Sequence, residues 1–119
     1  MEGRIQPGTD LDAVAAGLFD RLAAIGADGV GITRETFGAG EGAAFDLGEA
    51  LAREHGLLAA RDAAANLSIT LPATPDGLAP TPDRPCVVVA SHLDSVPQGG
   101  NFDGAAGVVA GLLSLLRMR

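Results

Sequence analysis

The sequence predicts an α/β fold, and three patterns lead to that prediction. Apolar residues recur at three- and four-residue steps in two stretches, which is the period of an amphipathic helix. Short apolar runs with β-branched residues follow, as is typical of strands. The last apolar run, residues 104–116, has the composition of a helix buried against a sheet. With 119 residues, we expect one modest domain or part of a larger one.

The first helix is predicted to begin after a cap at Thr9 or Asp10 and to stop at Gly26. Its inward positions share apolar character and helical spacing: Leu11, Val14, Ala15, Leu18, Leu22 and Ile25. The glycine-rich residues 29–34 are too short to assign, and residues 37–42 are predicted to form a loop.

A second helix is predicted from about Gly42 to His55, and Gly56 ends it. His55 falls in its last turn, where an imidazole interacts favourably with the carbonyl end of the helix dipole. We prefer this role for His55 to metal binding, because no other metal ligands neighbour it in the sequence.

Three short runs are predicted to be strands. Residues 57–60 and 67–71 would be neighbours, and five prolines from Pro72 to Pro85 then predict an exposed connection. Residues 87–90 would form a buried strand. The single cysteine, Cys86, opens this strand, and core packing suits it better than catalysis.

The charge and hydropathy of the chain exclude two classes of partner. A formal net charge of -7 argues against nucleic acid or anionic lipid, since both are polyanions. The start of the chain lacks the apolar stretch of a secretory signal, and the longest apolar run, residues 107–116, is too short to span a bilayer. We therefore expect a cytoplasmic protein that binds neither nucleic acid nor membrane.

The loop after the last predicted strand contains three candidate residues for a metal site, His92, Asp94 and Asp103. Open α/β sheets place ligands at the carboxyl ends of their strands. Alternation along an extended chain puts Asp94 on the same side as His92, where its carboxylate can orient the imidazole. Glycines at residues 99–100 and 104 let the loop fold back, so that Asp103 can approach His92.

These residue types suit a dinuclear metal centre. Zinc binds neutral imidazole and carboxylate, and a site for two ions needs one carboxylate that bridges them. His92 and Asp103 supply that pair, and the predicted helix after Asp103 favours a negative charge at its start. The alternative is a strand end with a turn, in which His92 and Asp94 only hydrogen-bond to backbone groups.

The run from His92 to Gly104, followed by the residues Gly-Val-Val-Ala-Gly at 107–111, closely resembles a known metal-site signature. It is similar to that of the N-carbamoyl-L-amino-acid amidohydrolase, hydantoinase/carbamoylase and allantoate amidohydrolase family, within the dinuclear zinc peptidase-aminoacylase superfamily. Short stretches upstream resemble the amino-terminal region of that family in the same order: residues 22–26, 31–34, 56–57 and 62–67. The resemblance covers residues 11–116. It implies an α/β fold that is the first part of a zinc-peptidase-like catalytic domain, a mixed sheet with packed helices.

The resemblance also implies a reaction and a ligand set. His92 would bind one zinc or manganese ion, Asp103 would bridge two such divalent metal ions, and Asp94 would support His92. A metal-activated water would hydrolyse a carbon-nitrogen bond in a linear, small-molecule carbamoyl or ureido substrate. The complete family protein would be a homodimer.

By the same resemblance, several parts of the family protein would lie beyond Arg119: a Glu-Glu pair with the general base, two later histidine ligands and the dimerisation domain. We therefore expect residues 1–119 to be the amino-terminal part of the catalytic domain, truncated before the remaining ligands and inactive alone, since two ligands cannot close two coordination shells. Two alternatives stay open. One is a non-catalytic module that pairs with a partner chain through a sheet edge, and the other is a fragment of a related aminoacylase or aminopeptidase.

Overall fold

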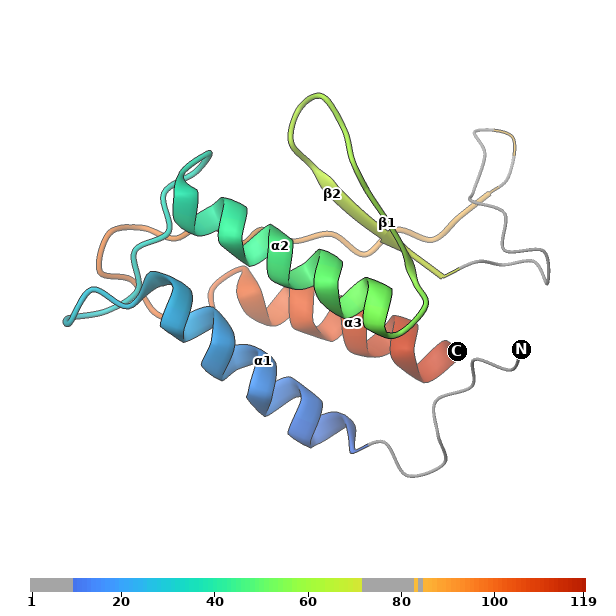
Figure 1. Cartoon of the computed structure of the whole chain (residues 1–119), viewed down its shortest axis with the longest axis horizontal. Helices are drawn as coiled ribbons and strands as arrows, with labels where there is room; N and C mark the ends of the chain where they lie inside the picture. The colour runs from blue at the N-terminus through green and yellow to red at the C-terminus, as the bar shows by residue number, and fades with distance from the viewer. Residues whose placement is uncertain (1–9, 72–82, 84) are drawn as a thin grey trace.

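The computed structural model describes residues 10–71, 83 and 85–119, which form three helices and a hairpin (Figure 1). In chain order the elements are α1 (Leu11–Gly26), α2 (Ala39–Glu54), β1 (Leu58–Arg61), β2 (Leu67–Thr70) and α3 (Ala105–Met118). Helix α1 contacts both other helices, and the hairpin contacts α2. The described part of the chain is therefore mixed α/β, as predicted, but its sheet has two strands only and is antiparallel.

Helix α1 confirms the first predicted helix at both ends. The carboxylate of Asp10 accepts hydrogen bonds from the backbone N–H groups of Asp12 at 3.0 Å and Ala13 at 3.2 Å. These are two of the four amides that a helix start leaves without an internal partner. Asp10 is thus the cap, and the helix ends at Gly26.

Helix α2 begins at Ala39, three residues before the predicted start at Gly42, so part of the predicted loop is helical. Its cap residue, Gly38, offers no side chain, but the carboxylate of Glu41 accepts the backbone N–H of Phe37 at 2.6 Å. This contact stabilises the first turn in the manner of a capping box. The helix ends at Glu54, and His55 lies directly after it, next to Gly56 with its positive φ of 62°.

Strands β1 and β2 confirm the two neighbouring strands to within one residue, with Ala59 opposite Ile69. Asp62 closes the turn by accepting the backbone N–H of Asn66 at 2.9 Å. Arg61, at the end of β1, reaches α2 and pairs with Asp46 at 2.6 Å and with Glu49. Most of the predicted proline-rich connection that follows lies outside the described residues, as does Thr9.

The predicted strand at residues 87–90 is wrong for the described part of the chain. This segment belongs to no strand there, and Val87, Val88 and Val89 are 95%, 75% and 67% exposed. Cys86 is also exposed, so its predicted role in the core is wrong as well. The physical reason is that a strand needs a hydrogen-bonded neighbour, and no described segment provides one.

The segment instead runs beside the glycines of α3. A Cβ built on Gly107 would lie 2.6 Å from Ser91 Oγ, and one on Gly111 would lie 3.5 Å from the Val89 side chain. Helix α3 therefore packs against this segment and α1. Its Leu116 also belongs to an apolar cluster against which Ala59 and Ile69 of the hairpin pack. Only one face of α3 is buried, through Ala105, Val109, Leu112 and Leu116.

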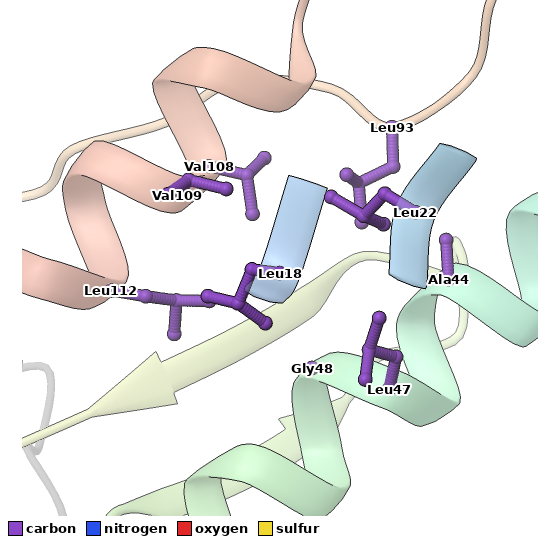
Figure 2. Close-up of a pocket in the computed structure, with 9 residues that line it drawn as sticks. All are labelled: Leu18, Leu22, Ala44, Leu47, Gly48, Leu93, Val108, Val109 and Leu112. Atoms are coloured by element: carbon purple, nitrogen blue, oxygen red, sulfur yellow. The ribbon is translucent and has the colours of Figure 1, made fainter. Parts of the chain in front are cut away.

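The main core lies between the three helices and includes one loop residue, Leu93. Figure 2 shows its side chain pointing from the loop toward Leu22 of α1. The remaining gap in this core is about 20 Å³ and has apolar walls. Such a space is too small for a substrate, since ligand pockets are about 300–1,000 Å³ in volume. Among the described residues, no helix is long and apolar enough to cross a membrane.

Candidate metal centre

The pair formed by His92 and Asp94 is positioned by the residue between them. Leu93 is 4% exposed and belongs to the core, whereas the side chains of His92 and Asp94 are 52% and 30% exposed. Successive side chains of an extended segment point to opposite sides. Burying Leu93 therefore turns both of its neighbours outward, on the same side of the loop.

The hydrogen bonds of the pair determine the tautomer of the histidine. Nδ1 of His92 lies 2.9 Å from Oδ1 of Asp94 and 3.3 Å from the Asp94 carbonyl oxygen. Both oxygens can only accept, so Nδ1 must carry the proton. The lone pair is then on Nε2, which is the arrangement that a carboxylate partner imposes on metal-binding histidines.

Asp94 has a second partner at its other oxygen. The hydroxyl of Thr36 donates to Oδ2 at 2.6 Å. This hydrogen bond, with the contact to His92, holds the pKa of the Asp94 carboxyl below its ordinary value of 3.8, although partial burial opposes it. Asp94 is therefore ionised at neutral pH and free to accept on both oxygens.

The segment before α2, residues 32–36, makes hydrogen bonds to the loop that carries His92 and Asp94. We call residues 32–36 the strap. The buried side chain of Arg34 donates from Nε to the Leu93 carbonyl at 2.7 Å and from Nη1 to the Leu22 carbonyl at 2.7 Å. In the backbone, the N–H of Ser95 donates to the Arg34 carbonyl at 2.8 Å. Burial lowers the pKa of Arg34, whereas the Asp94 carboxylate raises it.

Residues 32–33 of the strap also pair with residues 98–99 of the loop. The backbone N–H of Ile32 donates to the Gly99 carbonyl at 2.9 Å, and the N–H of Gly99 returns a bond of 2.8 Å. The hydroxyl of Thr33 accepts the N–H of Gln98 at 2.9 Å. The loop is thus attached to the strap on both sides of its turn at residues 96–99.

The loop folds back at Gly104, which lies directly against the imidazole. Gly104 has φ 71° and ψ -53°, and the N–H of Ala105 donates across it to the Asp103 carbonyl at 2.8 Å. This is a γ-turn with positive φ, a strained conformation that suits glycine. A Cβ at this position would lie 2.5 Å from Cε1 of His92.

Asp103 immediately precedes Gly104, the residue that lies against the histidine ring. Its side chain is exposed, just before the start of α3. In the described ranges, no three His, Cys, Asp or Glu side chains lie close enough together to hold a metal ion. Binding of one ion by His92 and Asp103 together stays a prediction. The donor types nevertheless suit a divalent cation, because they are an imidazole whose Nδ1 contacts a carboxylate and the carboxylate of the residue that precedes Gly104.

Two residues of the site were not found from the sequence, Arg34 and Thr36. Residue type gives no signal for Arg34, because arginine is almost never fully buried unless it is paired. No local pattern marks Thr36, because its partner lies 58 positions later in the chain.

No model of a protein family matches the chain. The N-carbamoyl-L-amino acid amidohydrolase of Geobacillus stearothermophilus is 43% identical over 80% of this chain and 23% of its own length. Proteins named N-carbamoyl-L-amino-acid amidohydrolase from Paenarthrobacter aurescens and Rhizobium meliloti are 36% and 32% identical, over 76% and 94% of this chain and 21% and 26% of their own lengths. The chain is related to the N-carbamoyl-L-amino-acid amidohydrolases.

The resemblance predicted from the run His92 to Gly104 is thereby confirmed, and the chain shares ancestry with a hydrolase family. It spans about a quarter of the length of these amidohydrolase relatives. Their names favour the carbamoyl branch over the aminoacylases and aminopeptidases.

Proposed function

We propose that this chain supplies part of the metal centre of an amidohydrolase that cleaves a carbon-nitrogen bond in a linear carbamoyl or ureido compound. The substrate class would be N-carbamoyl-L-amino acids, with allantoate as a related ureido compound. The observation that supports this best is the pair of His92 and Asp94, with Nδ1 and Oδ1 2.9 Å apart and the imidazole seated against Gly104. The names of the relatives support the substrate class.

In this proposal the residues of the chain have separate roles. His92 would offer Nε2 to one divalent ion, zinc or manganese, and Asp103 would offer its carboxylate to two. Asp94 would keep the proton of His92 on Nδ1, so that Nε2 stays available. When bound, two such ions would polarise the carbonyl of the substrate and lower the pKa of a water molecule.

The described residues supply two of the ligands, whereas a zinc ion takes about four. The further ligands and the general base would come from other segments of the protein. We therefore propose that these residues hydrolyse substrate poorly on their own, and that the complete protein is a cytoplasmic homodimer.

Metal titration tests this proposal directly. The parent chain should bind zinc weakly, as measured by competition with a chromophoric chelator. His92→Ala and Asp103→Ala should each remove this binding. Asp94→Ala should weaken it by about 10- to 100-fold, which is typical for a carboxylate that supports a metal-binding histidine.

The second histidine provides a matched control. His55 lies at the end of α2, and His55→Ala removes an imidazole without touching the proposed site, so zinc affinity should stay at the parent value. If His92→Ala and Asp103→Ala bound zinc as well as the parent, the assignment of the site would be wrong.

A further inference from the structure

We propose that Thr36 is a positioning residue for the metal-site histidine: its hydroxyl holds the Asp94 carboxylate in the orientation that fixes the tautomer of His92. The importance of this tautomer rests on the proposed function. The underlying chain of contacts, from Thr36 through Asp94 to His92, consists of protein groups alone and can be tested without metal.

The first step is the division of the two oxygens of Asp94. Thr36 occupies Oδ2 at 2.6 Å and His92 occupies Oδ1 at 2.9 Å. The terminal torsion of an aspartate is broad and is not fixed by its own rotamer preference. A carboxylate that is 30% exposed can therefore turn toward water unless a second contact holds it. Thr36 provides that contact, and it leaves Oδ1 facing the imidazole.

The second step is that Thr36 is itself fixed in place. It lies two residues after Arg34, whose side chain is fully buried and donates to the carbonyl of Leu93, the residue between His92 and Asp94. Ser95, on the other side of Asp94, donates its N–H to the Arg34 carbonyl. The strap and the loop are thus joined on both sides of Asp94, so the backbone that carries Thr36 has little freedom to move away.

The third step separates positioning from folding. The side chain of Thr36 is exposed, so water can replace its hydrogen bond and the net contribution to stability is small. Thr33 in the same strap differs, because its hydroxyl contacts Asp28 and the N–H of Gln98 but neither residue of the pair. Loss of the Thr33 hydroxyl should therefore affect the loop without affecting the tautomer of His92.

The experiment uses the whole chain and reads the tautomer by long-range ¹H–¹⁵N correlation spectroscopy. The chain contains two histidines, so a His55→Gln background leaves one imidazole to observe. The buffer is alkaline enough for imidazole rings in general to be neutral. We expect the Nδ1–H form in the parent, a mixture with the Nε2–H form in Thr36→Val, and return of the parent pattern in Thr36→Ser. Thr33→Val should keep the parent pattern while its thermal midpoint falls.

A second measurement connects the tautomer to metal binding. The zinc dissociation constant should rise about 3- to 10-fold in Thr36→Val, less than for loss of the carboxylate that touches the ring, and Thr36→Ser should restore it. If Thr36→Val keeps the parent tautomer, the inference is overturned, whatever its zinc affinity. If Thr36→Val does not fold, Thr36→Ala is measured in its place against the same criteria.

The two proposals fail in different ways. If the zinc affinity of the parent chain does not depend on His92, the proposed function fails. The tautomer measurement still shows whether Thr36 orients Asp94 against His92. If zinc binds as proposed and the tautomer of Thr36→Val is unchanged, only the role of Thr36 is refuted.

Discussion

Replacing Gly104 with alanine should damage both the fold and the proposed metal site. The new Cβ would lie 2.5 Å from the carbonyl oxygen and 2.5 Å from Cε1 of His92, and 2.6 Å from its Nδ1. The backbone carbonyl cannot move freely, because the neighbouring Leu93 is anchored in the core. The substitution also places a side chain at φ 71°, in the γ-turn that begins α3.

The magnitude follows from these two effects. A non-glycine residue in such a backbone region costs about 1–3 kcal/mol, and forced overlap in a packed site costs about 1–3 kcal/mol. The lower chain entropy of alanine in the unfolded state offsets about 0.4–1 kcal/mol. We therefore expect Gly104→Ala to lower the free energy of unfolding by roughly 2–5 kcal/mol, a large share of the roughly 5–15 kcal/mol of a typical small protein.

Urea unfolding followed by circular dichroism measures this loss, with Gly100→Ala as the matched control. Gly100 belongs to the same loop, has no neighbouring atom within 4 Å of a built Cβ, and lies outside the positive-φ region. The control should therefore unfold within about 0.5 kcal/mol of the parent, as surface substitutions usually do. A Gly104→Ala chain that unfolds at the same urea concentration as this control would refute the packing argument and the close approach of the loop to His92.

Two further predictions concern carboxylates that cap local structure. Asp10→Ala should lower the free energy of unfolding by about 0.5–2 kcal/mol, because it removes the hydrogen bonds to the first amides of α1; urea unfolding at neutral pH measures this, and an unchanged midpoint would contradict the capping role. The Thr33 hydroxyl and neighbouring backbone amides hold the pKa of Asp28 below its ordinary 3.8. The folded pKa is thus lower than the unfolded one, so this stabilisation is present above the ordinary pKa and is lost as the pH falls through the folded value. Between about pH 5 and pH 2 the parent should lose more stability than Asp28→Asn, and equal losses in both chains would refute the assignment.

The sequence predicted those elements whose evidence is local. Helix α1 shows the expected cap at Asp10 and the expected stop at Gly26, because capping groups and helical periodicity act within a few residues. The hairpin was predicted for the same reason, since a short polar turn joins two apolar runs. The start of α2 was misplaced because its N-terminal hydrogen bond does not come from a residue at the cap position. Instead, the carboxylate of Glu41 accepts the backbone N–H of Phe37, just before the first turn.

Residues 87–90 were misassigned because a strand is defined by a partner that its own sequence does not specify. Val87, Val88 and Val89 have the composition of a buried strand, but in the described part of the chain they lie exposed beside α3. The glycines of α3 explain this position, since Gly107 and Gly111 leave room for the segment to approach the helix closely. The same close approach determines the position of His92, which follows this segment in the chain. The predicted strand was therefore wrong, and the position of this segment beside α3 was not predicted.

The site itself combines local and distant determinants in the same way. The His92 and Asp94 contact follows from a two-residue spacing around a buried Leu93, so alternation along the chain was enough to predict it. The orientation of Asp94 depends on Thr36, 58 positions away, and the position of Thr36 depends on the burial of Arg34. A short motif can therefore indicate candidate metal-binding groups, whereas the contacts that orient those groups come from parts of the chain that only the folded structure brings together. On this argument, a variant of Arg34 or Thr36 that keeps the whole run from His92 to Gly104 would still carry the family signature while its histidine lost the orientation that metal binding needs.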